Sequence, residues 1–223
     1  MLRSTATFGG CDGSILPHPN RVQPDGTFLA TPARGTLTGN RGVLHGADGI
    51  VGAARWKHRA WVCCELSFRG RHRPIMPPGR WTALFFLDES VALAAGHRPC
   101  GQCRHADYRR FADAWNLATG HWPGAVAMDR EMHAARAHPG ARLLRHHVCD
   151  AGDLPDGTMV EIDRRAHLVL ERHALPYGPD GYGAPRPMPD GDVTVLTNAA
   201  TVRVLGAGYR PRLHRSARAR ANG

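Results

Sequence analysis

The sequence is poor in lysine, cysteine and acidic side chains. Lys57 is the only lysine, so 28 of the 29 basic residues are arginine, and only 19 residues are acidic. Six cysteines are few for 223 residues, and their clustering suits a metal site in a reducing cytosol better than a disulfide framework. No stretch approaches the roughly 18 consecutive apolar residues of a membrane span, and the N-terminus lacks the apolar segment of a signal peptide. We therefore expect a cytoplasmic protein, associated with the nucleoid, that does not contact a membrane.

The charge balance points to the kind of partner. A formal charge of +10 and a pI near 10.2 predict binding to a polyanion. A GC-rich genome would also raise the arginine, alanine and glycine content, but it does not demand an excess of ten positive charges. Arginine is the better residue for two-pronged contacts with phosphate and guanine. We expect a nucleic-acid partner, DNA in preference to RNA, and make no prediction of oligomeric state.

Four of the six cysteines lie between residues 63 and 103. Cys100 and Cys103 have the Cys-x-x-Cys spacing that lets two thiolates bind one zinc ion at about 2.3 Å each. Upstream, Cys63 and Cys64 are adjacent, and adjacent side chains on a regular strand point to opposite faces. Either a bulge lets both bind the metal, or one is a ligand and the other is buried, in which case His45 or His58 becomes a candidate fourth ligand.

The segment around the downstream pair resembles a known family. Its residues Ala95-Gly96-His97-Arg98-Pro99-Cys100-Gly101-Gln102-Cys103-Arg104, with the strand and short helix before them, resemble the metal-binding domain of the Ada DNA-repair protein over residues 82–112. The resemblance implies a zinc ion bound by four thiolates, those of Cys63, Cys64, Cys100 and Cys103. In that family a zinc-bound cysteine accepts a methyl group from a DNA phosphotriester. The family's upstream Cys-x-x-x-Cys pair is replaced here by adjacent cysteines, so we expect zinc binding without methyl transfer.

The motif also has a partial copy in the same chain. Residues 81–99 and 193–211 align without gaps and share Thr82/Thr194, Leu84/Leu196, Leu93/Leu205, Ala95/Ala207, Gly96/Gly208, Arg98/Arg210 and Pro99/Pro211. The second copy has no cysteine. Glycine favours the end of a helix and proline prevents its continuation, so the shared pattern predicts a strand, a short helix and a turn used twice.

The pattern of the whole chain predicts an α+β fold. We expect a β-rich N-terminal half with a zinc knuckle, a two-helix middle and a small C-terminal β unit, with one core or two left open. Predicted strands cover 61–68, 81–86, 158–162 and 166–171, and predicted helices cover 106–117 and 125–136. The expected parts are an irregular arm (1–20), a zinc-knuckle domain (21–150), a β-rich unit (151–211) and a disordered basic tail (212–223).

Two segments carry candidate catalytic residues. The glycine-rich loop Arg34–His45 offers Asn40 to contact a base edge and His45 as a general base, although a plain surface loop is an equally good interpretation. On the predicted helix 125–136, Asp129 and His133 are i, i+4 neighbours that would form an acid–imidazole pair, or else an exposed salt-bridging helix end. Candidate nucleic-acid contacts are the arginines Arg34, Arg41, Arg69, Arg71, Arg73 and Arg104.

Three functions are compatible with these features. The leading hypothesis is a zinc-containing DNA-binding protein of the DNA-repair or restriction kind, a hydrolase with nuclease or glycosylase activity that cuts a phosphodiester or N-glycosidic bond. Its zinc would be structural, because four thiolates leave no position for water. The alternatives are a nucleic-acid-binding module without enzymatic activity, and a small-molecule enzyme whose fold contains a structural zinc.

Overall fold

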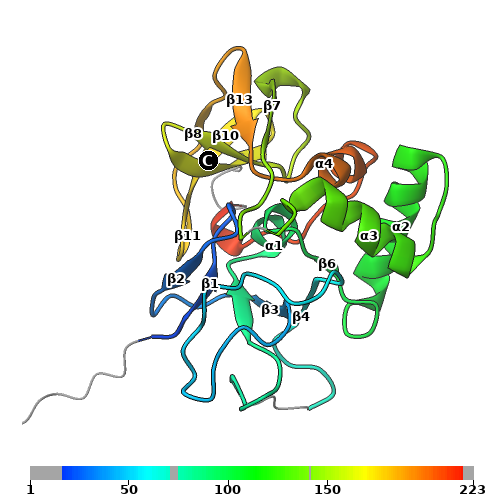
Figure 1. The fold of residues 1–223 in the computed structure, drawn as a ribbon. Helices are drawn as coiled ribbons and strands as arrows, with labels where there is room; N and C mark the ends of the chain where they lie inside the picture. The colour runs from blue at the N-terminus through cyan, green and yellow to red at the C-terminus, as the bar shows by residue number, and fades with distance from the viewer. Residues whose placement is uncertain (1–16, 71–74, 141, 218–223) are drawn as a thin grey trace, which may run out of the picture.

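A computed structural model describes residues 17–70, 75–140 and 142–217 of the chain. Two β-sheets lie at opposite ends of the molecule, and the short helix α1 (Glu89–Ala94) lies between them (Figure 1). Helices α2 (His105–Thr119), α3 (Ala125–Arg136) and α4 (Ala199–Gly206) gather beside this stack. The predicted α+β class is confirmed. In the described residues, no helix has the length and apolar character needed to cross a membrane.

The N-terminal sheet is mixed. Two of its pairings are parallel, β1 with β5 and β4 with β6, and the others are antiparallel. A Pro24-Asp25-Gly26 turn joins β1 to β2, and Gly26 has the positive φ of 85° that such a turn favours. In the order β2-β1-β5-β3-β4-β6, the strands are β1 (Pro19–Val22), β2 (Phe28–Ala30), β3 (Leu37–Asn40), β4 (Val62–Glu65), β5 (Leu84–Phe86) and β6 (Arg98–Pro99).

The C-terminal sheet is antiparallel. Its strand order is β11-β10-β9-β8-β13-β7, with β12 paired to β10. Two predicted strands, 158–162 and 166–171, correspond to β8 and β9. The strands are β7 (His147–Asp150), β8 (Met159–Ile162), β9 (Arg165–Leu170), β10 (His173–Gly178), β11 (Gly181–Tyr182), β12 (Arg186–Pro187) and β13 (Asp192–Val195).

The two sheets share one hydrophobic core through α1. All six residues of this helix are buried, and its apolar side chains pack with Leu84 and Phe86 of one sheet and with Met159 and Leu168 of the other. Helices α2, α3 and α4 form a second cluster around Phe111, Trp115 and Met132. Contacts cross the expected boundary at residue 150, since β7 pairs with β13 and α4 packs on α2 and α3.

The internal repeat is visible as two equivalent helix ends. Gly96 after α1 and Gly208 after α4 have φ values of 85° and 98°. In both copies the next residue donates its backbone N–H five residues back, from His97 to Ala92 over 2.8 Å and from Tyr209 to Val204 over 3.2 Å. This pattern is the Schellman motif, in which a left-handed glycine lets two backbone N–H groups satisfy carbonyls of the last turn.

The segment predicted to be a disordered basic tail is packed against the core over residues 212–217. The backbone N–H of Arg212 donates to Glu89 over 2.8 Å, and that of His214 donates to Asp88 over 2.9 Å. Ala217 is fully buried. The prediction of disorder was wrong for residues 212–217 because it relied on the small number of apolar residues in this segment. The segment is instead held by hydrogen bonds to carboxylates that lie more than 120 positions earlier in the sequence. Residues 218–223 lie outside the described part of the chain.

Candidate metal centre and its surroundings

Three cysteine sulfur atoms lie together beside the N-terminal sheet. The Sγ atoms of Cys64, Cys100 and Cys103 are all within 4.8 Å of one another. Sulfur ligands at about 2.3 Å from a tetrahedral zinc ion would be about 3.8 Å apart, so these sulfurs need to move little to bind one ion. Cys64 is buried, whereas Cys100 and Cys103 are partly exposed. The cluster could therefore hold a metal ion such as zinc.

Strand pairing explains how the cluster forms. Strand β6 pairs in parallel with β4, placing Val62 opposite Arg98 and Cys63 opposite Pro99. The backbone N–H of Cys100 then donates to the carbonyl of Cys63 over 3.0 Å, which brings the start of the knuckle beside Cys64. A tight turn follows, in which the N–H of Arg104 donates to the carbonyl of Cys100 over 3.1 Å. This turn brings Cys103 back toward Cys100 and leads directly into α2.

The adjacent cysteines of β4 take different roles. Cys64 belongs to the cluster, whereas the Cys63 side chain is fully buried and its sulfur accepts a hydrogen bond from Arg104 Nη1 over 3.0 Å. Burial raises the pKa of the Cys63 thiol to about 12, which opposes the thiolate form that a metal requires. Cys63 is therefore not part of the cluster, because strand alternation directs the two side chains to opposite faces.

Hydrogen bonds between the sulfur atoms and to the backbone shift the pKa values of the three clustered cysteines. The Cys64 thiol and the backbone N–H groups of Cys103 and Gln102 donate to the Cys100 sulfur, and these bonds lower the pKa of Cys100 well below its usual range. The Gln102 N–H lies 3.4 Å from that sulfur. Burial instead raises the pKa of Cys103, and the bond to Cys100 raises that of Cys64. A metal ion that binds there would displace the protons that remain on the thiols.

Neither candidate for a fourth ligand joins the cluster. The Nδ1 atom of His45 lies 2.6 Å from the Thr82 hydroxyl, and the Nε2 atom of His58 lies 3.0 Å from the Asn40 side-chain oxygen. Among residues 17–70, 75–140 and 142–217, three cysteines are the ligand set that the structure brings together. A tetrahedral ion would keep one position for water or another ligand, unlike the four-thiolate site that the sequence suggested.

The sequence suggested Arg104 as a nucleic-acid contact, but its side chain is buried inside the protein. Its side chain has no exposed area, and Nη2 lies 2.7 Å from Glu89 and 2.6 Å from Asp107. Glu89, also fully buried, accepts further bonds from the Tyr209 hydroxyl and the Arg212 backbone. The arginine that follows the cysteine knuckle therefore ties it to the N-terminus of α1 and to the C-terminal segment.

Arg41 is also buried and not available to a phosphate. Its guanidinium carbon lies 4.4 Å from the centre of the Trp61 ring, and Arg136 lies 3.9 Å from the same ring. The two cations donate to the backbone carbonyls of Ala95 and Gly96, at the C-terminal end of α1. Helix α1 therefore has carboxylates at its N-terminal end and guanidinium groups at its C-terminal end, the arrangement that the helix dipole favours.

The predicted catalytic pair Asp129 and His133 is not formed. Asp129 is buried and both its oxygens are engaged by Arg98, at 2.8 Å from Nε and 2.8 Å from Nη2. The His133 ring instead packs edge-on against Trp56 and Trp61, with centroids 5.9 and 5.8 Å apart. Asp129 pairs with Arg98 of β6 instead of with His133 of its own helix. The i, i+4 spacing of Asp129 and His133 could not reveal this pairing, because Arg98 lies outside the helix. Asn40, His45 and His133 have separate partners and do not form one catalytic group.

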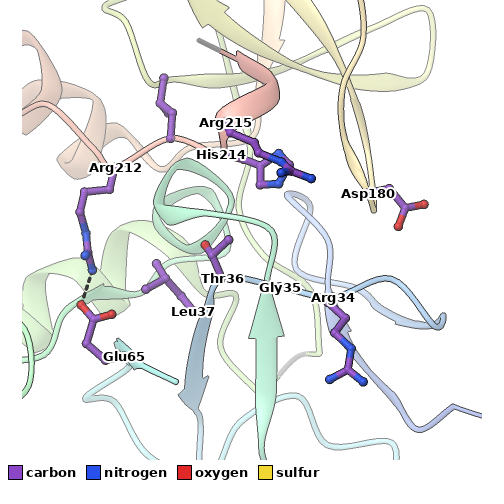
Figure 2. Close-up of a pocket in the computed structure, with 10 residues that line it drawn as sticks. Arg34, Gly35, Thr36, Leu37, Glu65, Asp180, Arg212, His214 and Arg215 are labelled. Carbon is purple, nitrogen blue, oxygen red and sulfur yellow. Dashed lines mark hydrogen bonds and ion pairs between the residues drawn. The ribbon is translucent and has the colours of Figure 1, made fainter. Parts of the chain in front are cut away.

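The remaining arginines occupy different surfaces. Arg69 is exposed beside the Phe68 ring, and Arg71 and Arg73 lie outside the described residues. Arg34 borders a cleft of about 710 Å³ (Figure 2), lined also by Gly35, Thr36, Leu37, Glu65, Asp180, Arg212, Leu213, His214 and Arg215. Figure 2 shows Arg212 turned to Glu65, and Arg34 pointing away from His214 and Arg215. The cations of the cleft do not converge on one point.

Comparisons with known proteins assign no relative to this chain. No protein-family model, no curated protein and no solved structure matches it. The similarity to the Ada metal-binding domain is therefore supported only by the cysteine cluster, and it assigns no family.

Proposed function

We propose that the protein binds one zinc ion through Cys64, Cys100 and Cys103 and that it is a nucleic-acid-binding protein, with DNA as the favoured partner. The observation that carries the metal assignment is the meeting of three sulfur atoms within 4.8 Å from two separate segments of the chain. Thiolates select soft or borderline metals, and zinc is the usual ion of a knuckle with tight Cys-x-x-Cys spacing. The ion would link β4 to the turn that begins α2.

The formal charge of +10 supports the nucleic-acid part of the proposal. Binding is better supported than hydrolysis, because the residues considered for catalysis are engaged separately, Asp129 by Arg98 and His45 by Thr82. Cutting of a phosphodiester or N-glycosidic bond in DNA repair or restriction stays a prediction that no described contact supports. We therefore place the non-enzymatic binding protein ahead of the nuclease or glycosylase.

Metal analysis of the purified protein tests the metal assignment. We expect about one zinc per chain by mass spectrometry, and a loss of most of it in Cys64→Ser, Cys100→Ser and Cys103→Ser. Two matched controls are Cys63→Ala, which changes the adjacent buried cysteine, and Cys149→Ser, which changes a cysteine in β7 of the other sheet. Both controls should keep the zinc content of the original protein.

A second readout covers the case in which the cluster variants fold poorly. Cobalt(II) added to the original protein should give a thiolate-to-metal charge-transfer band that a stoichiometric amount of zinc removes. Absence of both zinc and the cobalt band from a folded protein would exclude the proposed centre. Equal loss of metal in Cys63→Ala and Cys64→Ser would show that the ligand set is assigned wrongly.

A further inference from the structure

Within the described residues, neither Arg41 nor Arg136, the two buried arginines beside Trp61, forms an ion pair. The hydrogen bonds of Arg41 go to the carbonyls of Gly26 and Ala95, and those of Arg136 go to Gly96 and Arg59. Burial lowers the pKa of each guanidinium to about 9, so both remain positively charged at neutral pH. A carbonyl supplies only a partial charge. The two cations therefore project a positive potential through the poorly screened protein interior toward the nearest surface.

The segment that contacts both arginines consists of Trp56, Lys57, His58 and Arg59, and we call it the Trp56–Arg59 surface. The backbone of this segment is hydrogen-bonded to both arginines: the Lys57 N–H donates to the Arg41 backbone carbonyl over 2.7 Å, and the Arg136 guanidinium donates to the Arg59 carbonyl. The Trp61 indole adds a 2.7 Å bond to the His58 carbonyl. The side chains of Lys57, His58 and Arg59 are exposed.

Trp56 adds an aromatic side chain to these charges. It is half-buried, and its ring is held by Trp61 at 5.3 Å and by the edge of His133 at 5.9 Å between centroids. Neither Lys57 nor Arg59 takes part in an ion pair within the described residues. The segment thus offers two free cations on either side of His58 and one immobilised indole at the same surface.

We infer that the Trp56–Arg59 surface binds single-stranded nucleic acid, with Lys57 and Arg59 on the phosphates and Trp56 stacked on an unpaired base. This inference rests on the proposed nucleic-acid binding and assigns it a location and a strand preference. Stacking on an aromatic ring requires a base that is free of its own stack, which a duplex does not offer. An anionic ligand would also relieve the cost of the two buried cations below.

Charge-matched variants test the location. Lys57→Gln/Arg59→Gln removes two positive charges from the surface, and Arg164→Gln/Arg172→Gln removes two from exposed turns of the C-terminal sheet. Binding of a fluorescent oligodeoxynucleotide is measured by anisotropy over a range of salt concentrations. We expect the first pair to weaken binding at least ~10-fold and to reduce the salt slope by about 1.4, since each single-strand phosphate contact contributes about 0.7. The control pair should change affinity less than ~2-fold.

Trp56→Ala tests the strand preference. We expect it to weaken binding of the single strand at least ~5-fold and to change binding of the matching duplex much less. If the original protein binds no nucleic acid at low salt, the proposed function fails. If it binds and both charge pairs weaken binding equally, or if Trp56→Ala affects strand and duplex alike, the proposed function stands and the inference on this surface is wrong. Circular dichroism confirms that each variant is folded.

Discussion

Arg104 and Glu89 form an ion pair in which neither side chain has any exposed area, with 2.7 Å between Nη2 and Oε2. Removing one member of such a pair leaves a buried charge without compensation, which costs about 3–5 kcal/mol. We expect Arg104→Met to lower the free energy of unfolding by that amount in urea titrations. Adding Glu89→Gln should recover part of the loss, because the uncompensated carboxylate is then gone.

The matched control is Arg110→Met, which removes a neighbouring arginine that pairs with Asp107 over 2.8 Å but is half exposed. Exposed pairs contribute less than about 1 kcal/mol, so this variant should be nearly as stable as the original protein. Equal destabilisation by the two substitutions would contradict the view that burial of the Arg104–Glu89 pair is what matters.

The pH dependence of stability should contain a contribution from His97. Burial, reinforced by the positive charges of Arg41 and Arg136, holds the pKa of His97 well below its usual value. The unfolded chain therefore binds more protons than the folded protein below about pH 6.5. The contribution of neutral His97 to the free energy of unfolding is fully present above that pH. It falls as the pH drops, by up to about 1.4 kcal/mol per pH unit.

A His97→Phe variant isolates that contribution. Phenylalanine keeps an aromatic ring beside Phe86 and Trp61, whose centroids lie 4.6 and 5.6 Å from that of His97. Urea unfolding at about pH 8, where His97 is neutral in the folded and the unfolded chain, measures the change in the free energy of unfolding that does not depend on protonation. Between about pH 6.5 and 5, the variant should lose less stability than the original protein. Parallel pH curves for the two proteins would rule out a buried neutral His97.

The two glycines of the internal repeat should respond differently to the same substitution. A Cβ atom at Gly96 would lie 2.4 Å from Arg136 Cδ and 3.2 Å from the Trp61 ring, whereas one at Gly208 meets nothing within 4 Å. Gly208→Ala therefore costs only the backbone strain of a positive φ, about 1–2 kcal/mol. Gly96→Ala adds the displacement of a buried arginine, and we expect about 3 kcal/mol or more in total. Thermal unfolding of both variants provides the comparison, and equal costs would contradict it.

Much of the local structure could be predicted from the sequence, because short-range patterns determine it. Strands β8 and β9 correspond to the predicted segments 158–162 and 166–171, and helix α3 coincides with the predicted segment 125–136. The repeated glycine turn followed from Gly96 and Gly208 alone. Each of these predictions depends on residues within a few positions of one another.

The burial and the partners of the arginines could not be predicted, because they depend on residues that are distant in the sequence. Arg41 and Arg104 look like surface cations in sequence, and their burial depends on Ala95, Glu89 and Trp61. The same holds for Asp129, whose partner is 31 positions away. Alternation along β4 allowed one cysteine to be a ligand and one to be buried, but only the pairing of β4 with β6 decided that Cys64 is the ligand candidate.

The packing of the C-terminal segment against the N-terminal end of α1 has a consequence for folding during synthesis. Asp88 and Glu89 leave the ribosome long before their partners, since Tyr209 follows by 120 positions and His214 by 126. At about 5–20 residues per second, translation takes roughly 6–25 s to reach those residues. During that interval Glu89 can pair with Arg104, and Asp88 can accept from the Val91 N–H, but both carboxylates lack their partners in the C-terminal segment. The N-terminal end of α1 therefore gains its contacts with the C-terminal segment only when synthesis has almost ended. We expect a chain interrupted after β13, which lacks these contacts, to be a better substrate for chaperones and proteases than the finished protein.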